Sequence, residues 1–285
     1  MASHNWILTA QCPSRLGTVD AVTGHLFHHQ HYITELHSFD DCHSDRFFIR
    51  AKFRADEPFN EAEFRQQFAT RAEKFAMDWQ LRAADYKPKV VIMVSKFDHC
   101  LNDLLYKYRI GQLAIEIPAI ISNHPDLEPL AQWYAIPYYH LPITPATKAT
   151  QEAQVMQIIT DSQAELVVLA RYMQVLSSEL CQKLEGWAIN IHHSLLPGFK
   201  GAKPYHQAYA KGVKTVGATA HYINDDLDEG PIIAQGIEPV DHTYYPDDLI
   251  AKGRDIERVT LSRAVRYHVE RRVFLNGNRT VVFAD

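Results

Sequence analysis

The sequence has 285 residues, which is more than one typical domain needs and enough for two. Hydrophobic residues make up 46% of it and charged residues 22%, so both domains can bury a core. The formal net charge of -5, without any block of like charges, argues against a general nucleic-acid-binding protein and leaves room for a small anionic ligand. No apolar run approaches the about 20 residues of a membrane-spanning helix, and the N-terminus does not resemble a secretion signal.

Cysteine and histidine are frequent metal ligands, but here they do not have the spacing of a metal site. The four cysteines are far apart and form no Cys-x-x-Cys pair; they are Cys12, Cys42, Cys100 and Cys181. Such scattered thiols predict a reduced, cytoplasmic protein without a disulfide framework. Four histidines crowd one segment without a cysteine or carboxylate at a recognised spacing; they are His25, His28, His29 and His31. We therefore predict no metal there and interpret the segment as the end of an amphipathic helix.

Roughly the first 85 residues alternate between segments typical of strands and segments typical of helices. Strands are predicted at 6–10, 32–39, 46–53 and 78–83. Helices are predicted at 19–27 and 60–75, where apolar residues recur at helical spacing. The resulting order, strand-helix-strand-strand-helix-strand, is the ferredoxin-like βαββαβ pattern.

This segment resembles an ACT domain, a small regulatory module that often pairs between subunits and binds amino acids at the paired edges. Its turn at residues 12–17 is similar to the Pro-x-x-x-Gly loop of that family, although Ser14 stands where many members carry an acidic residue. The resemblance implies a regulatory and oligomerisation domain over residues 1–86. We therefore expect a homo-oligomer, either a dimer or a tetramer, with an amino acid as the candidate effector.

A second pattern follows a short polar connector at residues 84–89. Apolar runs typical of buried strands occur at 90–94, 113–121, 137–141, 166–170 and 188–191. Helical stretches lie between most of them, which predicts a mostly parallel, doubly wound α/β sheet. Such sheets bind ligands beyond the carboxyl ends of their strands. The residues after Val94, Ala170 and Ile191 are therefore the first places to look for a site.

Asn190 and His192 lie at the end of the last of these strands. Side chains at positions i and i+2 of a strand share a face, so we expect the two to point together. An amide beside an imidazole suits the stabilisation of an oxyanion and the movement of a proton. The same spacing also fits a buried pair that holds a loop, and the spacing alone does not decide between the two.

An acidic turn at residues 224–231 follows a strand predicted at 217–222. Three aspartates and a glutamate lie within five residues of this turn; they are Asp225, Asp226, Asp228 and Glu229. Their mutual repulsion predicts raised pKa values. A merely solvated turn is the alternative interpretation.

Together the two clusters resemble the formyltransferase catalytic domain that uses 10-formyltetrahydrofolate. The signature Asn-x-His-x-Ser-Leu-Leu-Pro stands at 190–197 and Asp-x-Leu-Asp-x-Gly-Pro stands at 225–231, and residues 201–208 extend the similarity. The resemblance covers residues 89–285 and implies a Rossmann-like fold with Asn190, His192 and Asp228 as the catalytic trio. It also implies a folate pocket, formed by Leu169, Tyr172, Gln174, Val175, Leu176, Asn224, Asp225 and Leu227.

The acceptor of the formyl group distinguishes the members of this family. Members that formylate glycinamide ribonucleotide hold its phosphate with a glycine-rich loop after the first strand, whereas residues 95–100 here contain no glycine, and Asp98 is predicted to cap a helix. Formylation of an initiator tRNA calls for a basic surface, which this acidic chain lacks. The ACT-like module is joined directly to this domain, and His193 stands where transferases commonly have proline. In these two features, and in the segment Tyr205-His206-Gln207, the chain resembles the member that uses water.

The resemblance therefore implies hydrolysis of 10-formyltetrahydrofolate to formate and tetrahydrofolate, without a cofactor or a metal. Such a reaction supplies formate for purine synthesis and balances one-carbon pools. In the mechanism that we expect, Asp228 with a raised pKa orients or deprotonates water, and Asn190 and protonated His192 stabilise the oxyanion.

Three alternatives remain open. The chain could be a formyltransferase for an unidentified amine, or a regulatory protein that only binds folate. The third is a metallohydrolase built on His192, His193 and His221, although these residues lack a dedicated ligand spacing.

Overall fold

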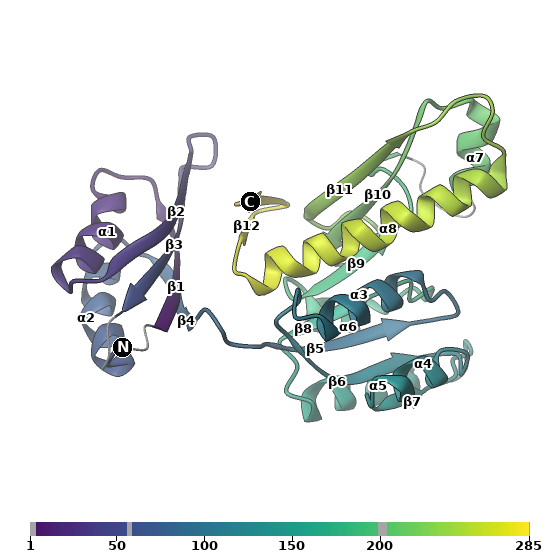
Figure 1. Ribbon diagram of the computed structural model, residues 1–285, viewed down its shortest axis with the longest axis horizontal. Coiled ribbons are helices and arrows are strands. Elements are labelled where there is room, and N and C mark those ends of the chain that lie inside the picture. Colours follow the sequence, from purple (N-terminus) through teal and green to yellow (C-terminus); the bar gives the residue numbers. More distant parts are fainter. Residues whose placement is uncertain (1–3, 56–58, 199–203, 285) are drawn as a thin grey trace. The chain divides into compact units, whose positions relative to one another are not determined.

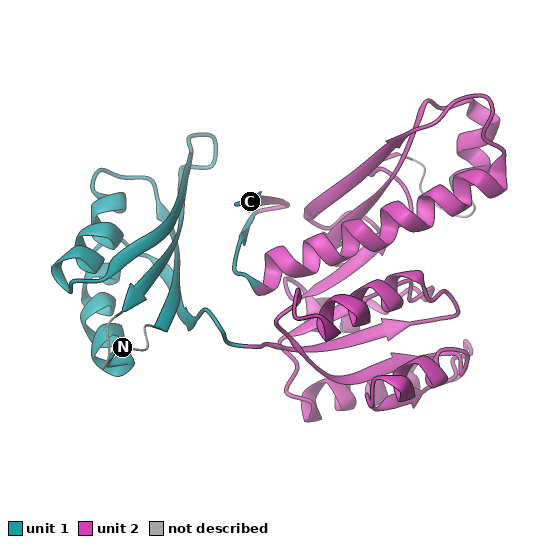
Figure 2. Cartoon of the chain, in the orientation of Figure 1, with its two compact units in different colours: residues 1–86, 270–276, 281–285 teal, residues 87–269, 277–280 magenta. Residues whose placement is uncertain are grey.

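The computed structural model describes residues 4–55, 59–198 and 204–284. The chain forms two compact units, shown in Figure 2. Unit 1 comprises Met1–Tyr86 with Glu270–Asn276 and Val281–Asp285, and unit 2 comprises Lys87–Val269 with Gly277–Thr280. Among the described residues, no helix is long and apolar enough to cross a membrane.

Unit 1 has the predicted βαββαβ order. Its elements are β1 (His4–Pro13), α1 (Thr18–His28), β2 (Tyr32–Asp41), β3 (Arg46–Ala55), α2 (Glu61–Lys74) and β4 (Asp78–Ala83). The strands form an antiparallel sheet in the order β2-β3-β1-β4, with α1 and α2 on one face (Figure 1). The fold is consistent with an ACT-like domain, as the sequence predicted.

Strand β3 is buried on both faces, which explains where the end of the chain packs. Phe47 and Ile49 belong to the core that faces the helices, whereas Phe48 alternates onto the other face. There Phe48 packs against Phe274 and Phe283, which come from the C-terminal strands β12 (Val273–Asn276) and β13 (Arg279–Val282) and the residue that follows them. The C-terminal segment was expected in the second domain, over residues 89–285, but residues 270–276 and 281–285 cluster with unit 1 because their aromatic side chains cover this face.

Unit 2 is an α/β unit built on a seven-stranded sheet in the order β11-β10-β9-β8-β5-β6-β7. The strands are β5 (Lys89–Val94), β6 (Glu116–Ser122), β7 (Tyr138–His140), β8 (Leu166–Leu169), β9 (Ala188–His192), β10 (Thr215–Tyr222) and β11 (Ile232–Pro239). The helices are α3 (His99–Arg109), α4 (Glu128–Trp133), α5 (Lys148–Asp161), α6 (Ser178–Leu184), α7 (Pro204–Lys211) and α8 (Pro246–Val269). Strands β5 to β9 pair in parallel, and β10 and β11 are antiparallel, so the predicted mostly parallel sheet is confirmed.

The order of the strands positions the site. From β5 the chain moves outward to β6 and β7, and then returns to β8 on the other side of β5. The segments after β5 and β8 therefore leave the sheet in opposite directions, and the crevice between them is where open α/β sheets bind ligands. Strand β9 lies next to β8 and brings Asn190 and His192 to the same edge. Helix α8 packs along β10 and β11 and against α3.

Candidate active site

The structure brings His192 and Asp228 into direct contact. Nδ1 of His192 lies 3.1 Å from Oδ2 of Asp228, which belongs to the turn after β10 and has a left-handed backbone with φ 60°. Nε2 of His192 is buried and has no hydrogen-bond partner among the described residues. A carboxylate on one nitrogen fixes the orientation of the imidazole, so the other nitrogen is presented to whatever occupies the site.

His221 connects Asn190 with Asp228. It pairs with Asn190 across β9 and β10, and its Nε2 lies 3.3 Å from Nδ2 of Asn190 and 3.8 Å from Oδ1 of Asp228. Its Nδ1 lies 2.8 Å from the carbonyl oxygen of Tyr222. From the sequence, His221 is a candidate only as a metal ligand, because the register of two antiparallel strands cannot be read from motif spacing. In the structure its ring lies near the side chains of both Asn190 and Asp228.

The expectation of a raised pKa at Asp228 was wrong. Burial by itself raises the pKa of this carboxyl group, but hydrogen bonds from His192 and His221 outweigh burial and hold the pKa below its ordinary value. The neighbouring Asp225 bonds to Ser178 and Gln182 of α6 instead. Asp228 is therefore ionised at neutral pH.

The residues predicted to form the folate pocket divide into buried and exposed groups. Leu169 and Tyr172 are buried in the core of unit 2, where the hydroxyl of Tyr172 accepts a hydrogen bond from Gln151. Val175 and Leu227 are large apolar residues that remain 59% and 63% exposed. Exposed apolar side chains in a predicted pocket are available to contact a ligand. The folate pocket formed by the segments 169–176 and 224–227 stays a prediction.

A second polar cluster surrounds the carboxylate of Glu257, on α8. This carboxylate is 1% exposed, and its partners come from three other segments of unit 2. His99 lies 2.7 Å and Arg171 lies 3.4 Å from Oε2, and the hydroxyl of Tyr205 donates to Oε1 at 2.8 Å. Burial raises the pKa of Glu257, but His99 and Arg171 outweigh burial and hold it below its ordinary value. We call Glu257, His99, Arg171 and Tyr205 the Glu257 cluster.

His193 connects the Glu257 cluster with His192. Its ring centroid lies 5.1 Å from that of His192 and 6.2 Å from that of Tyr205. Burial, followed by the positive charge of Arg171, lowers the pKa of His193 to about 4, so its ring is neutral at neutral pH. The sequence singled out Tyr205, His206 and Gln207 only by resemblance; of these, Tyr205 is buried and the other two are exposed. Residues 201–203 of the same motif lie outside the described residues.

The Glu257 cluster also contains the atoms that come closest to a metal site. Within the described part of the chain, the one group of three ligand atoms at short range is that of His99, Cys100 and Glu257. The metallohydrolase alternative used none of these residues. Both oxygens of Glu257 already accept hydrogen bonds, and the cationic Arg171 lies beside them, so the group is poorly suited to a cation.

Side chains occupy the loop after β5, where a phosphate-binding member would have glycines. The guanidinium carbons of Arg171 and Arg254 lie 5.3 and 5.7 Å from the ring centroid of Phe97. Asp98 occupies the position before α3, but its side chain makes no capping hydrogen bond because its backbone is already helical, and it accepts one from Asn102 instead.

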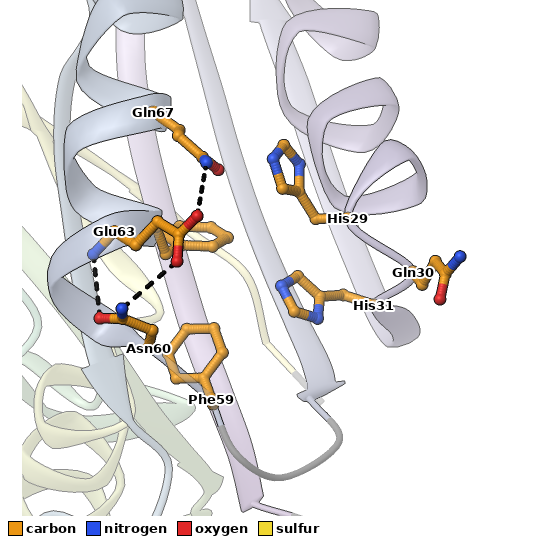
Figure 3. A pocket seen from close by; sticks show the side chains of 8 residues that line it. His29, Gln30, His31, Phe59, Asn60, Glu63 and Gln67 are labelled. Carbon is orange, nitrogen blue, oxygen red and sulfur yellow. Dashed lines mark hydrogen bonds between the residues drawn. The ribbon is translucent and has the colours of Figure 1, made fainter.

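Unit 1 contains a cavity of about 260 Å³ between the end of α1 and the start of α2. His29 and His31 face Asn60, Glu63 and Gln67 across it, whereas Gln30 points away (Figure 3). The side-chain amides of Asn60 and Gln67 donate to Glu63, and Phe59 and Phe64 complete the lining.

Comparisons with known proteins identify the family of this chain. Residues 88–265 match the model of the formyl transferase family. The formyltetrahydrofolate deformylase of Corynebacterium sp. (strain P-1) is 57% identical over 97% of both chains. The crystal structure of a formyltetrahydrofolate deformylase from Pseudomonas putida KT2440 is 68% identical, covers 98% of this chain and 100% of that chain, and has a TM-score of 0.93. Glycinamide ribonucleotide transformylase 1 from Symbiobacterium toebii is 27% identical, covers 72% of this chain and 98% of that chain, and has a TM-score of 0.66.

Proposed function

We propose, because this chain belongs to the formyltetrahydrofolate deformylase family, that it hydrolyses 10-formyltetrahydrofolate to tetrahydrofolate and formate. The observation that carries the chemistry is the contact of His192 with Asp228, which leaves Nε2 of His192 buried and without a partner among the described residues. The folate is the substrate, and the reaction as we write it uses no cofactor.

The catalytic roles follow from the charges of the trio. Ionised Asp228 accepts the Nδ1 proton of His192 and orients the ring, whose Nε2 we assign as a donor to the formyl oxygen together with the amide of Asn190. Water adds to the formyl carbon, the bond from that carbon to N10 breaks, and N10 takes up a proton. Because the pKa of Asp228 is low, it orients the water and accepts a proton only once the new C–O bond makes that water acidic.

His221 supports this arrangement as a positioning residue. The contact of its Nδ1 with the carbonyl oxygen of Tyr222 orients the ring, and its Nε2 lies near the side chains of both Asn190 and Asp228. The NH₂ group of Asn190 carries two protons, so it can face Nε2 of His221 with one and donate to the formyl oxygen with the other.

Release of formate from 10-formyltetrahydrofolate, with no amine added, tests the proposal. We expect purified protein to release formate and Asp228→Asn to lose on the order of 10²–10³ in turnover, as for the removal of one preorganised group. Asp226→Asn is the matched control, because Asp226 lies in the same turn but is exposed. Wild-type turnover in Asp228→Asn contradicts the assigned role. An absence of formate release, with folate still bound, indicates a transferase instead.

The folate pocket, the effector and the oligomer complete the proposal. The pterin contacts the predicted segment after β8, including Gln174 and Leu176, and the turn with Asn224 and Asp225. In unit 1, the imidazoles and the carboxylate across the cavity of Figure 3 suit the two charged ends of an amino acid. Strand β2 is an unpaired edge of its sheet and offers a surface for pairing between subunits. The cytoplasmic location expected from the scattered thiols stays a prediction.

A further inference from the structure

One residue, His193, lies between the Glu257 cluster and the proposed reactive imidazole. The ring of His192 contacts that of His193, which contacts Tyr205, and the hydroxyl of Tyr205 donates to Glu257. The cluster draws on the start of α3, the loop after β8, α7 and α8. It therefore fills the carboxyl-terminal edge of the sheet around the switch point, where a ligand of this fold is expected.

Arg171 occupies a backbone position that disfavours its side chain. Its φ of 66° is left-handed, which costs a residue other than glycine about 1–2 kcal/mol. Such strain persists only where the surroundings determine the conformation, and it gathers at functional sites. Here the guanidinium meets the carboxylate of Glu257 on one side and the ring of Phe97 on the other. The side chain is thus held across the crevice despite the strain.

The position of the Tyr205 ring requires a glycine in the middle of α8. A Cβ atom at Gly253 would lie 2.1 Å from the hydroxyl oxygen of Tyr205, so the helix leaves a notch into which the ring fits. Glycine inside a helix costs about 0.5–1 kcal/mol relative to alanine. Gly253 lies one helical turn before Glu257, and the notch brings the hydroxyl onto that carboxylate.

A buried, fully bonded carboxylate cannot bind a second substrate. Its oxygens already accept hydrogen bonds from Tyr205 and His99, and Arg171 balances its charge, so the carboxylate is not left to hold the amino or hydroxyl groups of an acceptor. Apolar residues would fill the same space with a smaller desolvation cost. The transformylase from Symbiobacterium toebii has the same fold in this unit, so the fold itself admits transfer to an amine.

We propose that the Glu257 cluster is a wall that keeps amines from the formyl carbon and leaves water as the acceptor. This inference rests on the proposed hydrolysis and adds the reason why water, and not an amine, is the acceptor. Water is small enough to reach the formyl carbon beside Asp228. A larger molecule that carries an amine must approach through the space that Arg171, His99 and Tyr205 occupy. Opening the wall turns part of the hydrolysis into transfer: the amine nitrogen bonds to the formyl carbon, the bond to N10 breaks, and N10 receives the proton that the amine loses.

The test replaces Arg171 and follows where the formyl group goes. Arg171→Gly removes the side chain at a φ that glycine favours, so the backbone is relieved rather than strained. Arg271→Gly is the matched control, because Arg271 has the same left-handed backbone, with φ 58°, but belongs to unit 1. Each full-length protein is given 10-formyltetrahydrofolate with and without glycinamide, and formate and N-formylglycinamide are both measured. Melting temperatures are recorded with and without glycinamide.

We expect the wild type and Arg271→Gly to make formate with at most a trace of N-formylglycinamide. Arg171→Gly should make both products, with the ratio of N-formylglycinamide to formate at least about tenfold higher, which is the size of effect that pocket shape exerts on substrate choice. Glycinamide should raise the melting temperature of Arg171→Gly only, because a ligand that enters the opened space stabilises the fold. Formate alone from Arg171→Gly, with no shift of its melting temperature, overturns the proposal.

Two further measurements keep the outcomes distinct. If Arg171→Gly does not fold, Phe97→Ala takes its place, because this ring is 39% exposed and packs under the same guanidinium group. The same result is expected from it, and formate alone from Phe97→Ala also overturns the wall. If the wild type releases no formate, the proposed hydrolysis is wrong, and the wall is then judged by whether glycinamide raises the melting temperature of the variant but not of the wild type.

Discussion

Two histidines show how a residue's surroundings set its charge. His25 lies among the rings of Phe64, Phe68 and His29, with its Nε2 buried and unbonded within the described structure. Burial, followed by the charge of His29, lowers the pKa of His25 to about 4. His193 shares this value through burial and Arg171. Both rings are neutral in the folded protein at pH values where an unfolded chain begins to bind protons.

The pH dependence of stability should therefore change when His25 is replaced. The unfolded residue binds a proton as the pH falls through about 6.5 and the folded residue only near 4, so stability is lost across this window and levels off below it. The loss amounts to about 3 kcal/mol at 1.36 kcal/mol for each pKa unit. We expect His25→Phe to flatten the unfolding free energy of unit 1 between pH 7 and about pH 5, measured with denaturant.

His28→Phe is the control for this experiment, because His28 lies on the same helix but is exposed. It should keep most of the pH dependence of the wild type, because the charge of His28 makes the smallest contribution to the lowered pKa of His25. An identical loss of stability in His25→Phe and in the wild type between these pH values would mean that His25 is not the group that titrates.

Motif spacing predicted where the site residues lie better than it predicted their charges. The shared strand face of Asn190 and His192 and the nearness of Asp228 follow from local rules and from the paired signature. The pKa of Asp228 does not, because acidic composition says nothing about which side chain faces an imidazole. Arg171 and Glu257 meet across 86 residues of chain. No spacing signal connects such a pair, although the left-handed backbone of Arg171 becomes a signal once the structure is known.

Among the elements, helix α8 has a strong influence on the candidate active site. The helix spans 24 residues and contributes Glu257 and the notch at Gly253. An alanine in a helix interior normally stabilises by about 0.5–1 kcal/mol over glycine. Here its Cβ would overlap Tyr205, and overpacking of this kind costs about 1–3 kcal/mol.

Gly253→Ala should therefore destabilise the protein when Tyr205 is present and stabilise it when Tyr205 is absent. We expect the free energy of unfolding to fall in the single variant. In a Tyr205→Ala background the same change should raise it. A double-mutant cycle in urea measures both values. Additive effects of the two substitutions would show that the ring and the helix do not compete for this space.

The predicted elements agree closely with the observed ones where periodicity is strong. The strand predicted at 78–83 coincides with β4, and the helix predicted at 60–75 with α2 to within one residue at each end. The strand predicted from Leu113 begins only at Glu116, because Leu113 and Ile115 are buried without pairing in the sheet. The predicted strand was therefore too long, because it included apolar residues that are buried but lie before the strand.

On the scale of the whole chain, the C-terminal segment belongs to the unit that begins the sequence. Phe274 and Phe283 cover Phe48, and the side chain of Arg50 donates to the carbonyl of Glu270. We expect Phe274→Ala to lower the unfolding free energy of unit 1 by about 3 kcal/mol, as for other buried aromatic residues. Leu275→Ala, at the exposed neighbouring position, should change it by less than about 0.5 kcal/mol.

Formate release by Phe274→Ala below its melting transition should remain at the level of the wild type, because the catalytic trio lies in unit 2. Equal stability losses in Phe274→Ala and Leu275→Ala would contradict the packing of the C-terminal segment on β3.

The return of the C-terminus to β3 also sets an order of events during synthesis. Domains generally fold as they leave the ribosome, with the first one emerging before the second is made. Within the described part of the chain, Phe274 and Phe283 supply the aromatic cover of Phe48 on the second face of β3, so unit 1 is completed late although its first strand is translated first. A ribosome that stops early leaves Phe48 uncovered on the nascent chain, and an incomplete product is thereby marked by an exposed aromatic surface that quality-control proteases and chaperones can recognise.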